Sequence, residues 1–259
     1  MFPAQRIEVL KRALREQKTV DIATLSNLLQ VSDVTVRKYL DKLESEGFLV
    51  KFHGGAMLAE DPDQAGDAAD GSLVSEDENE GVQIARLAKT MIDDGDSVFI
   101  GPGSTCFYIA REIAEYKNLT VVTNNVRVLE LLAPHIKNLQ FIGGEVAYND
   151  GFLYTYGQKT NAHLEGMYVQ KAFLSVHGVD MMAGLTTNDY ELLDIYKKID
   201  KIAKRVVILA DHKKFNKVCL HQIAKIEYYD VYISNEKLDS VYKKYFFENN
   251  IKILTSYDL

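Results

Sequence analysis

The sequence predicts an α/β protein of two domains, in which a small helical N-terminal domain precedes a larger domain with a mainly parallel sheet. The length of 259 residues suits two domains, because a single domain usually contains about 100 to 200 residues. Apolar side chains near the N-terminus recur every three or four positions, which is typical of amphipathic helices. Further along, short apolar runs alternate with helical stretches, as in a parallel sheet covered on both faces.

Three short helices are expected in the first domain, residues 1–58. Their apolar positions are Ile7, Leu10, Leu14, then Ile22, Leu25, Leu29, then Val36, Leu40 and Leu43. Ser32 is a suitable N-cap and Gly47 a suitable terminator, so the third helix should run from about Asp33 to Glu46. The stretch FLVKFHGGAML then alternates around two glycines, which predicts a small hairpin or wing.

Acidic charge is concentrated between the two domains. Residues 59–82 carry nine Asp and Glu and no Lys or Arg, whereas residues 1–58 carry nine basic and seven acidic residues. The formal net charge of −7 therefore does not exclude nucleic acid as a partner of the first domain. Because residues 59–81 have almost nothing to bury, we expect a flexible linker; the alternative is an acidic strip that competes with DNA.

The second domain, residues 82–259, should contain seven strands. The expected strands are 98–100, 119–124, 139–144, 171–176, 205–211, 229–234 and 251–255. Longer stretches between them, such as 104–116 and 190–203, should form helices. Ligands of such sheets bind at the carboxyl ends of the strands, so polar residues in those loops are candidates for a site.

Composition excludes several classes of protein. No apolar run approaches the ~18 residues of a membrane span, and the N-terminus lacks the apolar segment of a signal peptide, so we expect a cytoplasmic protein without a membrane partner. The only cysteines, Cys106 and Cys219, lack metal-ligand spacing. We therefore predict structural thiols, no metal site and no cofactor.

The third helix predicts a DNA interface. Its apolar side is opposed by a polar face, which is commonly just solvated. Since a shorter helix and a tight turn precede it, the arrangement is that of a helix-turn-helix, whose second helix reads the major groove. A guanidinium can pair with guanine, lysines can neutralise phosphates, and a capped helix start can donate to a phosphate. The expected DNA contacts are Ser32, Val34, Thr35, Arg37, Lys38 and Lys42 on this helix, and Lys51 and His53 on the hairpin.

The turn GPGST, residues 101–105, predicts an anion site. Gly101 and Gly103 let the backbone wrap an anion, and Ser104 and Thr105 add hydroxyl donors at a helix N-terminus; the alternative is that the glycines serve turn geometry alone. Loops at the same end of the sheet would complete a polar ring with Thr123, Asn124, Gly143, Gly144, His177, Asp180, Asp211 and Lys214. His177 is read as a hydrogen-bonding pocket residue, the alternatives being a base or a metal ligand. Tyr148, Tyr154 and Tyr156 either cover the ligand or pack ordinarily.

The run LSNLLQVSDVTVRKYLDKLESEGFLVKFHGGA resembles the winged helix-turn-helix of the DeoR family of bacterial transcriptional regulators. Tyr39 departs from the usual Asp, and Lys51-Phe52 from Arg followed by a small or β-branched residue, so no operator sequence is carried over. From about residue 82 the chain resembles the family's sensor domain, which is related in fold to ribose-5-phosphate isomerase and glucosamine-6-phosphate deaminase. The resemblance implies a phosphorylated sugar as effector, with Ser104, Thr105 and Lys214 as phosphate contacts.

The alternative function is a sugar-phosphate isomerase fused to a DNA-binding module. Isomerisation needs a carboxylate base, but the catalytic Glu of the isomerase pattern falls on Asn188, which cannot accept a proton at neutral pH. We therefore expect no enzyme activity and no catalytic residues. The prediction is a transcriptional regulator, a repressor of a carbohydrate-metabolism operon, that binds operator double-stranded DNA. It should form a homodimer or homotetramer, because two helices must enter major grooves about one turn apart.

Overall fold

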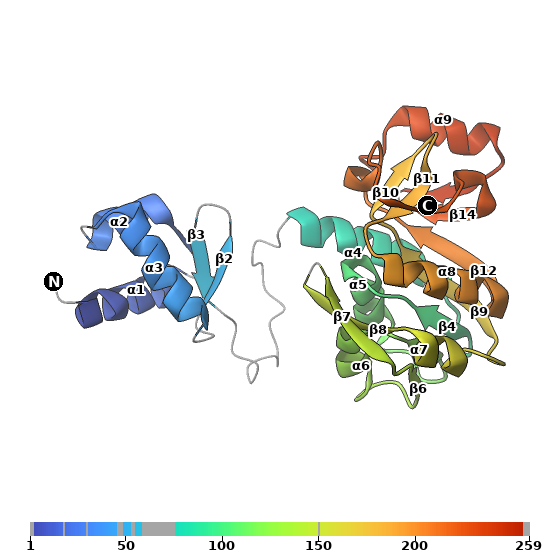
Figure 1. The fold of residues 1–259 in the computed structure, drawn as a ribbon, viewed down its shortest axis with the longest axis horizontal. Coiled ribbons are helices and arrows are strands. Elements are labelled where there is room, and N and C mark those ends of the chain that lie inside the picture. Colours follow the sequence, from blue (N-terminus) through green and yellow to red (C-terminus); the bar gives the residue numbers. More distant parts are fainter. Residues whose placement is uncertain are drawn as a thin grey trace. The chain divides into compact units, whose positions relative to one another are not determined.

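The fold is taken from a computed structural model, which describes residues 3–17, 19–29, 31–45, 49–52, 55–58, 76–149 and 151–255 (Figure 1). The chain divides into two units, Met1–Ser72 and Leu73–Leu259. Predicted residues Gly47, His53 and 59–75 lie outside the described residues. In the described part of the chain, no helix combines the length and apolar character that a bilayer crossing requires.

In its described residues, the first unit contains three helices and a three-stranded antiparallel sheet with the order β1-β3-β2. Its elements are α1 (Pro3–Gln17), β1 (Thr19–Asp21), α2 (Ile22–Leu29), α3 (Asp33–Ser45), β2 (Leu49–Phe52) and β3 (Gly55–Leu58). Asp21 caps α2, since its Oδ1 accepts the Thr24 N–H at 2.8 Å. The predicted apolar positions from Leu10 to Leu43 are buried, which confirms the helix pattern. The antiparallel pairing of β2 with β3 confirms the predicted hairpin.

The second unit is built on a seven-stranded parallel sheet with the order β15-β14-β12-β9-β4-β5-β6. Its strands are β4 (Ser97–Ile100), β5 (Thr120–Thr123), β6 (Asn138–Phe141), β9 (Val169–Ser175), β12 (Ala203–Leu209), β14 (Val231–Ile233) and β15 (Lys252–Leu254). The seven predicted strands are thus confirmed. All seven strands are parallel, but the chain adds them outward from the centre in two directions. It places β5 and β6 successively on one side of β4, and then β9, β12, β14 and β15 successively on the other side. The strand order therefore reverses between the central neighbours β4 and β9.

Helices cover both faces of this sheet. One face packs α4 (Glu76–Lys89), α5 (Ser104–Ile113) and α6 (Val126–Leu132), and the other packs α8 (Tyr190–Ile202) and α9 (Ser240–Glu248). The start of α4 corrects one boundary, because residues 76–81 were predicted as linker and are helical. The apolar face of α4, with Ile84, Ala85 and Ala88 fully buried, accounts for this.

Two small antiparallel sheets were not predicted. The hairpin β7 (Glu145–Asn149) and β8 (Phe152–Tyr156) precedes α7 (Gln158–His163), and β10 (Gly178–Asp180), β11 (Gly184–Thr187) and β13 (His221–Ala224) form the second sheet. Two 3-10 turns, His212–Lys214 and Ile226–Tyr228, follow β12 and β13. Cys106 is fully buried on α5, which raises the pKa of its thiol to about 12 and suits a structural role.

Candidate functional site

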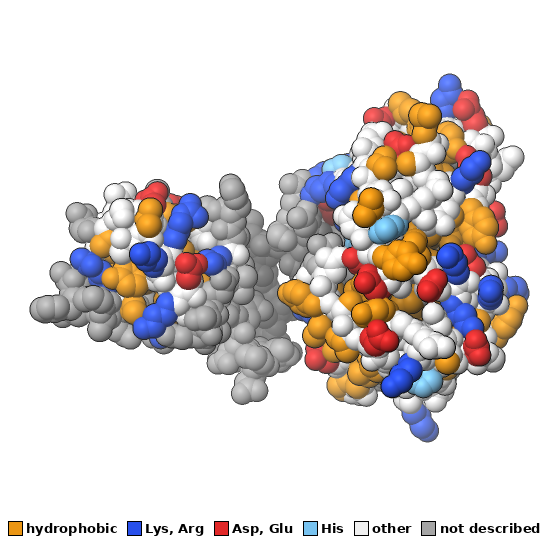
Figure 2. All heavy atoms as spheres, in the orientation of Figure 1, with side chains coloured by type: hydrophobic (Ala, Val, Ile, Leu, Met, Phe, Trp, Pro, Cys, Tyr) orange, Lys and Arg blue, Asp and Glu red, His pale blue; other side chains and the backbone are white. Residues whose placement is uncertain are grey.

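The start of α3 exposes the side chains that were predicted to meet DNA. The Ser32 carbonyl accepts the N–H groups of Thr35 at 2.8 Å and Val36 at 3.0 Å, so Ser32 begins the helix. Val36 is buried, whereas Arg37, Lys38 and Lys42 are exposed, and Val34 retains 65% of its surface. Figure 2 shows Lys and Arg side chains over the part of this unit where Figure 1 draws α3.

An ion pair joins the wing to this helix. Lys51 Nζ on β2 lies 2.6 Å from Asp41 Oδ1 on α3, and both side chains are partly exposed. A pair of this kind contributes about 0–1 kcal/mol, so phosphate can compete for Lys51. The contacts of Lys51 with DNA remain a prediction.

A pocket lies in the second unit where the strand order reverses, at the carboxyl ends of β4, β9 and β12. This is the position at which parallel sheets bind ligands. Its volume is about 50 Å³. Its lining residues are Pro102, Gly103, Ser104, Thr105, Asn149, Phe152, Tyr154, Ser175, Val176, His177, Asp189, Leu192, Leu209, Ala210 and Lys214.

The turn from β4 into α5 shapes one wall of the pocket. Gly103 has φ +100°, and a Cβ at this position would lie 2.6 Å from Ser175 Oγ, so only glycine fits. No side chain caps the N-terminus of α5, which leaves its first N–H groups for another acceptor. Asn125 steadies the turn by donating from Nδ2 to the carbonyls of Gly101 and Gly103, at 3.4 Å each.

Lys214 brings a positive charge to the same pocket. Asp211 Oδ1 accepts the Lys213 N–H at 2.8 Å, and the Asp211 carbonyl accepts the Lys214 N–H at 3.0 Å, which closes the turn that carries Lys214. Within the described ranges, Lys214 forms no ion pair, although it is only partly exposed. Its charge is therefore available to an anion in the pocket.

Five of the predicted effector residues line this pocket, and seven do not. The five are Gly103, Ser104, Thr105, His177 and Lys214. The seven are Gly101, Thr123, Asn124, Gly143, Gly144, Asp180 and Asp211.

Several of those seven have structural contacts instead. Thr123 Oγ1 donates to the Ile100 carbonyl at 2.7 Å and joins β5 to β4, whereas Asn124 Nδ2 donates to the Thr155 carbonyl at 2.8 Å and fastens β8 to the end of β5. Asp180 Oδ1 accepts two backbone N–H groups in the turn between β10 and β11, and these bonds lower its pKa. A Cβ at Gly144 would lie 2.0 Å from Thr160 Oγ1, so Gly144 serves close packing.

His177 is held by a short chain of hydrogen bonds. The Asp189 N–H donates to Thr187 Oγ1 at 3.0 Å, and Thr187 Oγ1 lies 2.8 Å from His177 Nδ1. The Asn188 N–H also points to Nδ1 at 3.4 Å. These contacts orient the imidazole ring at the pocket, and a contact of His177 with an effector stays a prediction.

A carboxylate in the pocket was missed. Asp189 Oδ1 accepts Asn149 Nδ2 at 2.5 Å, and Asp189 Oδ2 accepts the Tyr154 hydroxyl at 3.1 Å. Tyr154 is 3% exposed, and burial, followed by the charge of Asp189, raises its pKa. The sequence signal was an Asp immediately before a predicted helix, which reads as an ordinary N-cap.

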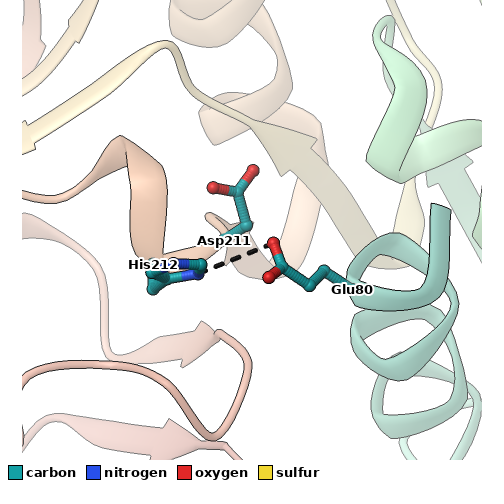
Figure 3. A group of neighbouring side chains, drawn as sticks. All are labelled: Glu80, Asp211 and His212. Atoms are coloured by element: carbon teal, nitrogen blue, oxygen red, sulfur yellow. Dashed lines mark ion pairs between the residues drawn. The ribbon is translucent and has the colours of Figure 1, made fainter. Parts of the chain in front are cut away.

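Beside the pocket, Glu80, Asp211 and His212 bring oxygen and nitrogen atoms within 4.8 Å of one another (Figure 3). This spacing suits a metal, but Glu80 already pairs with Lys237 Nζ at 3.0 Å and with Lys213 Nζ at 3.3 Å. Two ammonium groups occupy the carboxylate and oppose a further cation. The cluster therefore acts as an ion-pair network that holds α4 against the turn after β12.

Comparisons with known proteins place the chain in a family. The DeoR-like helix-turn-helix domain matches residues 6–61, and the DeoR C terminal sensor domain matches residues 76–236. The HTH-type transcriptional regulator IolR of Bacillus subtilis (strain 168) is 30% identical over 96% of this chain and 97% of its own length. A putative aga operon transcriptional repressor of Escherichia coli O157:H7 is 28% identical over 90% of this chain and 86% of its own length.

Similarity to solved structures is more remote. Ribose 5-phosphate isomerase A of Methanocaldococcus jannaschii aligns with a TM-score of 0.39 and 19% identity, over 54% of this chain and 55% of that chain. No function follows from a likeness at that level. Since the sensor-domain match alone spans more than half of the sequence, this chain belongs to the DeoR family of helix-turn-helix, DNA-binding transcriptional regulators.

Proposed function

We propose that this regulator is a repressor of a carbohydrate-metabolism operon and that a phosphorylated sugar controls it. The observation that carries the proposal is the shared opening of an unpaired lysine, Lys214, and an uncapped helix start, Gly103 to Thr105, into one pocket. Both features favour an anion with several oxygen acceptors, such as a phosphate group. The name of the aga operon repressor among its relatives supports the sign of regulation.

In this proposal α3 reads operator DNA in the major groove, and Arg37 at its exposed start pairs with a guanine. Two such helices bind about one helical turn apart, so the chain acts as a homodimer or homotetramer held by its second units. The domains are residues 1–58 and 76–259, the second beginning with α4, and the protein acts in the cytoplasm, where its operator lies. An effector that binds the two arrangements of the oligomer unequally, by about 1–3 kcal/mol, changes operator affinity by about 5–150-fold.

Isomerase activity is the alternative function, and one observation speaks for it. Asp189 supplies a carboxylate in the pocket, although Asn188, the position of the catalytic Glu, does not line it. A base must reach a proton next to the substrate carbonyl, and Asp189 already accepts two hydrogen bonds. We infer that the protein is not an enzyme, and an assay of aldose-ketose exchange on common sugar phosphates tests this directly.

The DNA part of the proposal is tested by footprinting beside the protein's own gene. Arg37→Ala should weaken operator binding by about 1–3 kcal/mol and relax base preference at one position. Its matched control is Lys197→Ala, which removes an exposed cation from the second unit and should leave binding unchanged. Equal binding by Arg37→Ala and the parent would reject the placement of the recognition helix.

The effector part is tested by adding sugar phosphates to the protein–operator complex. Thr105→Ala and Lys214→Ala should abolish release from DNA while operator affinity without effector stays at the parent value. Lys197→Ala again serves as the control. An unchanged response of both variants would move the effector site elsewhere.

A further inference from the structure

Asp189 occupies the N-cap of α8 but does not cap it. Asp is among the preferred N-cap residues because its carboxylate accepts free N–H groups of the first turn. Here no side-chain cap bond forms, and both carboxylate oxygens turn to the β7–β8 hairpin instead. Asp189 thus lacks the stabilising N-cap hydrogen bond that its position would allow, and its carboxylate faces the pocket instead.

The partners of Asp189 are neutral donors on a single structural element. Asn149 ends β7 and Tyr154 lies on β8, so both hydrogen bonds fasten the hairpin over the pocket. Among the residues that the structure describes, no cation pairs with Asp189. A carboxylate with only neutral donors can exchange them for other neutral donors without leaving a buried cation unpaired.

The pocket therefore has two chemically different ends. Lys214 and the start of α5 favour a phosphate, whereas Asp189 repels an anion and accepts hydrogen bonds. A ligand that fits both ends carries a phosphate at one end and hydroxyl groups at the other. Inorganic phosphate would use only the first end.

The size of the pocket adds a condition. Its volume of about 50 Å³ is small beside the ~300–1,000 Å³ that ligand pockets usually enclose. Movement of the hairpin would enlarge it, and the bonds from Asn149 and Tyr154 to Asp189 are the ones that such a movement opens. Hydroxyl groups of the ligand are the donors that can replace them.

We propose that Asp189 is the specificity-determining residue that recognises the carbohydrate end of the effector, accepting hydrogen bonds from sugar hydroxyls in place of those from Asn149 and Tyr154. The inference rests on the proposed sugar-phosphate function. It adds that the ligand is recognised and the hairpin is released in the same step: the Asp189 carboxylate loses its hydrogen bonds from Asn149 and Tyr154 and accepts hydrogen bonds from the ligand instead.

The test is titration calorimetry on the full chain with inorganic phosphate, ribose 5-phosphate, fructose 6-phosphate, glucose 6-phosphate and glucosamine 6-phosphate. Asp189→Asn keeps the shape of the side chain and removes its charge. It should weaken the best-bound sugar phosphate by about 10-fold or more, because hydrogen bonds to a charged acceptor are strong. It should leave inorganic phosphate unchanged or more tightly bound, because a nearby negative charge is lost.

Tyr154→Phe separates recognition from a purely structural role. It removes the hydroxyl that holds the hairpin to Asp189 and leaves the carboxylate intact, so sugar phosphate should bind a few-fold more tightly than to the parent. If Asp189 only fastened the hairpin, both variants would shift affinity in the same direction, and this result would overturn the inference.

The outcomes also separate the inference from the proposed function. If no sugar phosphate binds the parent protein, the proposed function fails and this inference fails with it. If sugar phosphates bind the parent and Asp189→Asn equally well, only the role of Asp189 is wrong. A preference for glucosamine 6-phosphate that is lost in Asp189→Asn would show that Asp189 pairs with an amine, and would overturn its assignment to hydroxyl groups.

Discussion

Gly103→Ala tests the geometry of the turn that carries the phosphate end of the pocket. Gly103 has φ +100° and ψ 166°, a region of backbone conformation that essentially only glycine occupies. Placing alanine there costs about 1–3 kcal/mol of folding free energy. The added Cβ also meets Ser175 Oγ at 2.6 Å, an overpacked contact that costs about 1–3 kcal/mol more.

Gly95→Ala is the matched control for the backbone cost. Gly95 has φ +105°, but a Cβ there would find no atom within 4 Å. The Gly95→Ala substitution therefore measures the cost of the backbone strain without the cost of a close contact. Differential scanning calorimetry on the full chain should show one transition lowered by both substitutions. Gly103→Ala should lower it by about 2–12 °C more than Gly95→Ala, since 1 kcal/mol shifts a domain of this size by about 2–4 °C.

A double-mutant cycle isolates the contact itself. In a Ser175→Ala background the obstructing Oγ is absent, so Gly103→Ala should cost at least about 1 kcal/mol less than in the parent. If Gly103→Ala melts together with Gly95→Ala, or if Ser175→Ala gives no relief, the close approach of this turn to β9 is refuted.

Three further predictions concern other parts of the chain. Burial raises the pKa of Asp200, whose Oδ1 has no hydrogen-bond partner among the described residues, so its charge destabilises the fold. Asp200→Asn should therefore raise the unfolding free energy above neutral pH, and denaturant titrations should show the gain vanish in acid as the parent carboxyl becomes protonated. Glu80→Gln leaves Lys213 and Lys237 without their shared carboxylate, so the same titrations should show the free energy of unfolding lowered by about 1–2 kcal/mol, and by less at high salt. An unchanged free energy of unfolding would show that this ion-pair network does not stabilise the fold. The exposed Val34 should contact the methyl group of an operator thymine. Replacing that thymine by deoxyuracil removes the methyl group, so gel-shift assays should show binding of the parent weakened by about 4-fold and binding of Val34→Ala unchanged.

The fold was predictable because its signals are local. Val36, Leu40 and Leu43 follow the helical period, and each strand of the large sheet is a short apolar run, so both classes of element can be read within a few residues. The turn at Gly103 was predictable for the same reason, because its glycines stand between an apolar run and a helical stretch; whether it binds an anion stays a prediction.

The β7–β8 hairpin and its partner were not predictable in this way. The pairing of Tyr154 with Asp189 joins residues 35 positions apart, and nothing near either residue encodes it. The roles of Thr123 and Asn124, which were predicted as effector contacts, depend in the same way on distant residues, because their side chains donate hydrogen bonds to the backbone of neighbouring segments. A polar residue at the end of a strand serves equally well in a pocket or in an anchor, and only the long-range contacts distinguish the two.

Those anchors explain how ligand binding can have a consequence beyond the pocket. The hairpin is held at its base by Asn124 and at the pocket by Asp189, so opening the second contact leaves the first as a pivot. On the opposite wall, Lys214 directly follows Lys213, which pairs with Glu80 on α4. If the proposed effector draws Lys214 towards its phosphate, we expect the neighbouring ion pair between Lys213 and Glu80 on α4, the first described helix after the linker in sequence, to shift with it. In the proposed function, the phosphate and hydroxyl groups of one ligand would then act on two different elements, whereas inorganic phosphate would act on one.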